Sequence, residues 1–139
     1  MVSWVDCYVF FEEFGVGLGG GGGFTPHLEG FPESCAPANL LLQLTDGLGG
    51  TTGLLWLGIS ETDIPFFGGR LYIDFSFQWA AITIMLSGPP GGDGLGVWSS
   101  PGIDFFEFQG LTFVLQATLL DAAAPFGVSL SNALRLDVR

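Results

Sequence analysis

The clearest alternation of apolar and polar residues lies at Ala133–Arg139, where two leucines and a valine alternate with charged residues. A period of two predicts a β-strand with one buried face and one solvated face. Further short apolar runs lie between turn residues. They predict strands at Leu40–Thr45, Leu54–Ser60, Arg70–Phe75, Ala81–Ser87, Ile103–Phe108 and Leu111–Asp121, with an early strand around His27 whose imidazole points outward.

Turn-forming residues punctuate the whole chain. The twenty-three glycines and eight prolines leave no long window with a helical period. Short strands separated by such turns are typical of an all-β fold, and we predict an antiparallel β-sandwich. The apolar positions of the predicted strands give an expected core of Leu55, Leu57, Ile59, Phe113, Leu115, Leu134 and Leu136.

The N-terminal segment Val2–Phe14 is apolar on both strand faces. One face carries Val5, Cys7, Val9 and Phe11, and the other carries Trp4, Tyr8, Phe10 and Phe14. Such a strand needs cover on both sides. The glycine-rich stretch Gly15–Gly23 that follows is expected to be a flexible connector, so the sequence divides into an apolar strand (1–14), a linker (15–23) and a sandwich (24–139).

Two arrangements of this N-terminal strand are open. It can be donated to a neighbouring subunit, with Trp4, Val5, Tyr8, Val9, Phe10 and Phe11 as the self-association residues, or it can fold back into its own sandwich. Cys7 and Cys35 could form a disulfide across the glycine run in an oxidising compartment, or remain two buried thiols.

Composition narrows the classes of partner. Hydrophobic residues make up 48% of the 139 residues and charged residues only 12%, which favours association with other molecules. The net charge is −11 with three arginines and no lysine, which argues against binding nucleic acid or an anionic membrane surface. The apolar run Phe75–Leu86 is shorter than the ~20 residues of a transmembrane helix, so we expect no membrane span.

Side chains that could act in catalysis or bind a metal are few, and we expect no catalytic, metal or cofactor site. His27 is the only histidine, which leaves no histidine-based metal set. Glu12 and Glu13 are adjacent on a strand and face opposite sides, and Asp93 in its glycine-rich turn is a single carboxylate. The glycine spacing within 17–23 lacks the helix that dinucleotide binding requires. Four aromatic residues, Trp56, Tyr72, Trp79 and Trp98, could instead form a platform for a glycan.

Several motifs carry a resemblance to a known family. They are the Gly-Val-Gly-Leu-Gly-Gly opening at Gly15 with Phe24-Thr25-Pro26, the run Leu54–Ser60, and the ending Gly110–Ala117 followed by Leu130–Leu134. From Gly15 to Arg139 the chain resembles a Gly/Pro-rich β-sandwich module that recurs near the C-termini of large secreted proteins of environmental bacteria. This resemblance implies export and a β-sandwich, and no established activity. Leu18 and Arg70 stand where the family usually has cysteines, so its disulfide pattern is not carried over.

These observations predict a protein that is not an enzyme. We expect an extracellular or cell-surface protein with a structural or adhesive role, and the resemblance implies a bacterial origin, although no export signal is visible at the N-terminus. Its partners would be copies of itself, in a homo-oligomer or in a homopolymer such as a filament or surface matrix, joined by strand donation. The alternative is a secreted β-sandwich module that binds a carbohydrate or another ligand.

Overall fold

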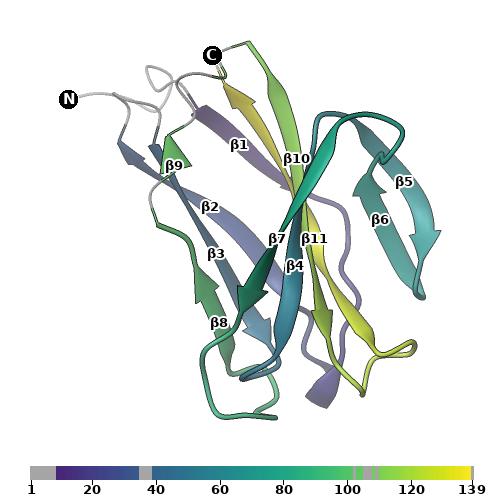
Figure 1. Cartoon of the computed structure of the whole chain (residues 1–139). Coiled ribbons are helices and arrows are strands. Elements are labelled where there is room, and N and C mark those ends of the chain that lie inside the picture. Colours follow the sequence, from purple (N-terminus) through teal and green to yellow (C-terminus); the bar gives the residue numbers. More distant parts are fainter. Residues whose placement is uncertain (1–8, 35–38, 102, 105–107, 109, 139) are drawn as a thin grey trace.

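The computed structural model describes residues 9–34, 39–101, 103–104, 108 and 110–138, and these form two packed layers of strands (Figure 1). One short helical element has both of its ends within these residues, a 3-10 turn at Gly21–Gly23. The strands are β1 (Val9–Phe14), β2 (His27–Ser34), β3 (Asn39–Gly47), β4 (Thr52–Gly58), β5 (Glu61–Phe66), β6 (Gly69–Ile73), β7 (Trp79–Met85), β8 (Gly96–Ser99), β9 (Ile103–Asp104), β10 (Thr112–Leu120) and β11 (Val128–Val138).

The strands form two main sheets and a hairpin. The first sheet has the order β1-β11-β10-β4-β7, and the second has the order β2-β3-β8, with β9 also paired to β3. The hairpin β5–β6 lies on the outer side of the first sheet. All of these pairs are antiparallel. The predicted antiparallel β-sandwich is therefore confirmed.

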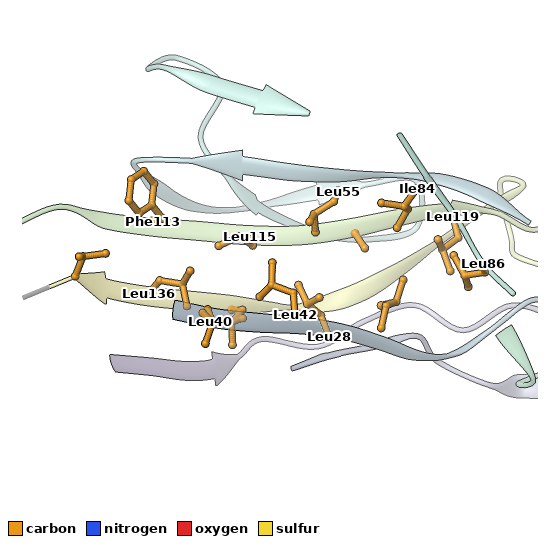
Figure 2. Close-up of a cluster of buried hydrophobic side chains, with 14 residues drawn as sticks. Leu28, Leu40, Leu42, Leu55, Ile84, Leu86, Phe113, Leu115, Leu119 and Leu136 are labelled. Carbon is orange, nitrogen blue, oxygen red and sulfur yellow. The ribbon is translucent and has the colours of Figure 1, made fainter. Parts of the chain in front are cut away.

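The core lies between the two sheets, where leucines from both layers point toward one another (Figure 2). Leu28, Leu40, Leu42 and Leu44 of the second sheet are fully buried against the first. Burial of each such side chain contributes about 1.5–3 kcal/mol, so these contacts are the main force holding the layers together.

The predicted core is largely confirmed. Leu55, Phe113, Leu115, Leu134 and Leu136 are buried, and Leu57 is partly buried against the same cluster. The prediction for Ile59 is wrong, because its side chain is 45% exposed. Strand β4 ends at Gly58, one residue before it, and the chain there turns away from the core toward β5.

Strand β11 is longer than predicted, and its additional part contains buried polar side chains. It begins at Val128, five residues before the alternating pattern, and runs through Ser131 and Asn132. The Ser131 hydroxyl accepts a hydrogen bond from the Ala117 backbone N–H at a bulge in β10. The Asn132 side chain accepts from the Leu28 N–H and donates to the Leu28 C=O, at 2.8 and 2.9 Å. These bonds satisfy polar groups in a buried strand.

The β5–β6 hairpin is attached to the first sheet by Gln116, which is fully buried. Its Oε1 accepts from the Tyr72 N–H at 3.0 Å, and its Nε2 donates to the carbonyls of Arg70 and Ser131 at 2.9 and 3.1 Å. Strand β5 was not predicted, because Glu61–Phe66 contains two acidic residues and Pro65 and has no apolar alternation. The strand is stabilised by its backbone pairing with β6 and not by a strand-like sequence pattern.

The glycine-rich stretch differs from the expected flexible connector, because its backbone is packed against the sandwich. Leu18 forms an isolated bridge with Leu130, and the Gly21 N–H donates to Asp121 Oδ2 at 2.9 Å. A Cβ at Gly20 would overlap the Asp121 carboxylate. Glycine is used here for close approach of the backbone to its neighbours, which composition alone does not distinguish from flexibility.

Strand β1 pairs with β11 of the same chain, from Val9 opposite Val138 to Phe14 opposite Ala133. For these six residues, which include Val9, Phe10 and Phe11, the structure has the fold-back arrangement. Trp4, Val5, Tyr8, Cys7 and Cys35 lie outside the described residues, so the structure does not bear on the disulfide or on the first part of the segment.

Candidate functional site: an apolar sheet edge

Strand β7 forms one edge of the first sheet, and the strand itself has no charge, proline or bulge of the kind that usually protects an edge. Its sequence, WAAITIM, has no charged residue and no proline, and its pairing with β4 is regular along all seven residues. Three large apolar side chains are exposed, Trp79 by 51%, Ile82 by 53% and Met85 by 71%. Natural edge strands are usually blunted by charges, proline or bulges, because an open apolar edge pairs with other chains.

The space between the two sheets is open beside this strand. Ile82 lies opposite Leu55 in the β4–β7 pairing, and therefore points toward the second sheet, yet it is half exposed. Beside it is an apolar gap of about 220 Å³. The gap is lined by Leu42, Leu55, Leu57, Ala80, Ala81, Ile82, Phe108 and Leu115. Core leucines of both sheets thus line a gap that reaches the surface.

The opposite edge, β1, is chemically different. Glu12 and Glu13 face opposite sides of the sheet, as predicted. The Glu13 carboxylate contacts His27 of the second sheet, and Glu12 lies 3.4 Å from Arg135. His27 is exposed, as expected from its place on an outward-facing position. Charged residues at this edge disfavour pairing with a further apolar strand.

Arg135 connects this charged edge to the hairpin. Its guanidinium donates to both Glu61 carboxylate oxygens, at 3.0 and 2.7 Å, and lies 4.4 Å from the centre of the Phe14 ring. Hydrogen bonding to Glu61 is the main cause that raises the pKa of Arg135 above its usual value. The charged guanidinium, bonded to Glu61 and beside Phe14, holds β5 and β1 next to β11.

Aromatic side chains gather on the outer face of the first sheet next to β7. The rings of Trp56, Phe75 and Trp79 lie with centres 5.1 to 5.6 Å apart. Of the four aromatic residues proposed as a platform, the structure brings only Trp56 and Trp79 together. Tyr72 of β6 is buried between the hairpin and the first sheet, and Trp98 packs against the core from the second sheet.

A second apolar groove, of about 350 Å³, runs along the outer face under the hairpin. Its walls include Leu54, Trp56 and Leu120 from the sheet and Phe66 and Phe67 from the hairpin. Among the described residues, none of those that line it is charged. Phe67 has a left-handed backbone with φ of 48°, which is unusual for a residue with an aromatic side chain.

Other candidate chemistry is sparse in the described part of the chain. It contains no group of three or more His, Cys, Asp or Glu residues placed to hold a metal ion. Asp93 lies beside Gly21 and Gly22, where its carboxylate packs against the glycine-rich stretch. Within the residues that the structure describes, no helix is long and apolar enough to cross a bilayer.

The sequence contained a signal for this edge that the strand prediction did not use. Residues 79–85 are apolar on both faces, as a strand covered on both sides would be. Whether that cover is supplied by the same chain depends on the strand order, which the local pattern does not reveal. The structure places β7 at the end of the sheet.

The fold defines the chain as an all-β protein of the antiparallel sandwich class. The chain matches no protein-family model, and searches of curated proteins and of solved structures find no match either.

Proposed function

We propose that this protein is an extracellular structural subunit that associates with copies of itself by strand donation, forming a filament or surface matrix. The observation that carries the proposal is the unprotected apolar edge β7, with the sandwich interior open beside it. Adding a strand to such an edge satisfies backbone hydrogen-bonding groups and covers apolar side chains at the same time. The subunit needs no catalytic residues for this role.

The two edges of the first sheet support a directional contact. β7 is apolar and uncharged, whereas β1 presents Glu12 and Glu13. A contact between two different surfaces is heterologous, and a head-to-tail contact of this kind that does not close gives an open polymer. The resemblance to a module of secreted proteins supports an extracellular setting.

The association state of the purified full chain tests this proposal. Sedimentation velocity over a concentration series should give a distribution that shifts to larger species, and negative-stain images should contain elongated assemblies. A chain that remains strictly monomeric at the highest soluble concentration contradicts the proposal.

A second candidate function, glycan binding, is favoured by the Trp56, Phe75 and Trp79 cluster. Trp79 and Phe75 are exposed by 51% and 36%, so a sugar ring could stack on them. Ser76 and Gln78, also exposed, lie on the adjoining loop and could supply hydrogen bonds.

Binding to a panel of insoluble polysaccharides tests the second candidate. Wild-type protein should be depleted from solution by one of them, and Trp79→Ala should not, whereas Trp98→Phe on the other sheet should behave as wild type. Failure of every polysaccharide to deplete the wild-type protein contradicts glycan binding of this kind.

A further inference from the structure

We infer that β7 accepts residues Val2–Tyr8 of a second copy of this chain as a sixth strand of the first sheet. The inference rests on the proposed self-association and assigns its donor, its acceptor and the side chains that meet. The donor segment directly precedes β1 in the sequence, and β1 and the acceptor β7 lie at opposite edges of the first sheet.

The acceptor has two different sides. The inner side is the apolar gap of about 220 Å³ between the sheets, beside Ala80 and Ile82. The outer side is the aromatic cluster, in which Trp79 lies 5.1 Å from Phe75 between ring centres. A strand added to β7 places alternate residues into the gap and alternate residues beside the aromatic rings.

The donor sequence matches this division. In the segment Val2–Tyr8, Val5 and Cys7 share one strand face and Trp4 and Tyr8 share the other. The gap is small and apolar, and suits the compact side chains of Val5 and Cys7. Trp4 and Tyr8 then extend the aromatic cluster, where rings 4.5–7 Å apart interact favourably. The reverse orientation would force two large rings into the gap and is disfavoured by overpacking.

The same chain cannot supply this strand to itself. β1 and β7 lie at opposite edges of a five-stranded sheet, so four strand spacings of about 4.8 Å, roughly 19 Å in all, separate them. Val5 is four residues from Val9, the first residue of β1, and a fully extended chain of that length spans at most about 14 Å. A Val2–Tyr8 strand on β7 must therefore come from another copy, and repetition of this contact without ring closure builds an open chain.

Two full-length variants test the assignment. Val5→Lys changes the donor and leaves β7 intact, and Ile82→Lys changes the acceptor and leaves the donor intact. Each variant alone should associate at least about 100-fold more weakly than wild type, because it brings an unpaired charge to an apolar contact. Mixed together, they should form a complex of one chain of each kind that grows no further, because one pair of functional surfaces remains.

The control is Phe126→Lys, which places the same charge on an exposed phenylalanine in the turn between β10 and β11 and should associate as wild type. Circular dichroism and thermal unfolding establish that each variant is folded, and Ala80→Glu replaces Ile82→Lys if the latter is not. If wild type assembles and the two variants assemble equally well, the assignment of donor and acceptor is wrong while self-association stands. If both variants are folded and monomeric but fail to pair when mixed, the assignment is also overturned. If wild type itself is monomeric, the proposed function fails first.

Discussion

At the scale of single residues, a buried polar side chain attaches the β5–β6 hairpin to the first sheet. Gln116 is fully buried, and its amide supplies one acceptor and two donors to three backbone groups. Ser129 is buried to a similar degree, yet its hydroxyl is the one buried side-chain polar atom without a hydrogen-bond partner among the described residues. A polar group in a core stabilises the fold only when its hydrogen bonds are satisfied.

Replacing Gln116 by Leu should lower the free energy of unfolding by about 3 kcal/mol, because the Tyr72 N–H and the Arg70 carbonyl lose their partner in a buried position. Ser129→Ala, which removes an unsatisfied hydroxyl, should be neutral or slightly stabilising. Urea denaturation followed by circular dichroism measures both variants. Equal effects of the two substitutions would contradict this account of the hairpin attachment.

The glycine-rich stretch gives a second prediction at this scale. Gly20→Ala should destabilise the protein by about 1–3 kcal/mol, because the added methyl group overlaps the Asp121 carboxylate. Gly30→Ala is the control, since its Cβ would lie 3.4 Å from leucine side chains, an ordinary contact distance. A neutral Gly20→Ala would mean that the stretch behaves as the loose connector that its composition suggested.

At the scale of elements, the β5–β6 hairpin has a turn whose conformation its own sequence does not favour. The β5–β6 hairpin closes through a two-residue turn, Phe67-Gly68, in which both residues have positive φ, 48° and 86°. Such turns favour Asn-Gly, because asparagine tolerates the left-handed conformation and phenylalanine pays a steric cost in it. The hairpin therefore keeps its shape through contacts with the sheet, including the bonds from Gln116, against a local preference.

Phe67→Asn should raise the free energy of unfolding by about 0.5–1 kcal/mol, as the relief of backbone strain exceeds the loss of the ring contact with Phe66. Thermal and urea unfolding measure the change. Phe126→Asn, also an exposed phenylalanine in a loop, controls for the removal of apolar surface. A decrease in stability specific to Phe67→Asn would mean that its contribution to the outer groove outweighs the strain.

At the scale of the whole molecule, charge and apolar surface act in opposite directions. The net charge of −11 makes subunits repel one another, while β7 and the gap beside it favour contact. Association then depends on the balance of the two, and the repulsive part is sensitive to salt.

Raising sodium chloride from low concentration to about 0.5 M should therefore strengthen self-association, because it screens repulsion between subunits of like charge. Sedimentation velocity at fixed protein concentration measures the shift. An uncharged osmolyte at matched osmolality is the control for effects that do not involve screening. Weaker association at high salt would indicate that the contact is held by ion pairs, contrary to an apolar edge.

The sequence by itself determined the fold class and most of the strands. Period-two patterns and glycine and proline punctuation are local. They correctly predicted the core leucines of β10 and β11 and the all-β character of the part of the chain that the structure describes. Strand β5 and the early part of β11 were not predicted, because neither has a clear alternation of apolar and polar residues. Pairing with β6 stabilises β5, and hydrogen bonds to Ala117 and Leu28 stabilise the early part of β11.

Only the tertiary structure decided which apolar strand is left uncovered. The segments Val2–Phe14 and Trp79–Met85 both carry apolar residues on two strand faces, although the first also contains Asp6, Glu12 and Glu13. This pattern predicts that both strands need cover, and it does not say which chain supplies the cover. The strand order places Val9–Phe14 against β11 at an edge with Glu12 and Glu13, and leaves β7 open over core leucines. Burial is a property of pairing between residues distant in sequence, so the composition of a strand predicts that it needs cover, while the fold alone decides whether the cover comes from its own chain.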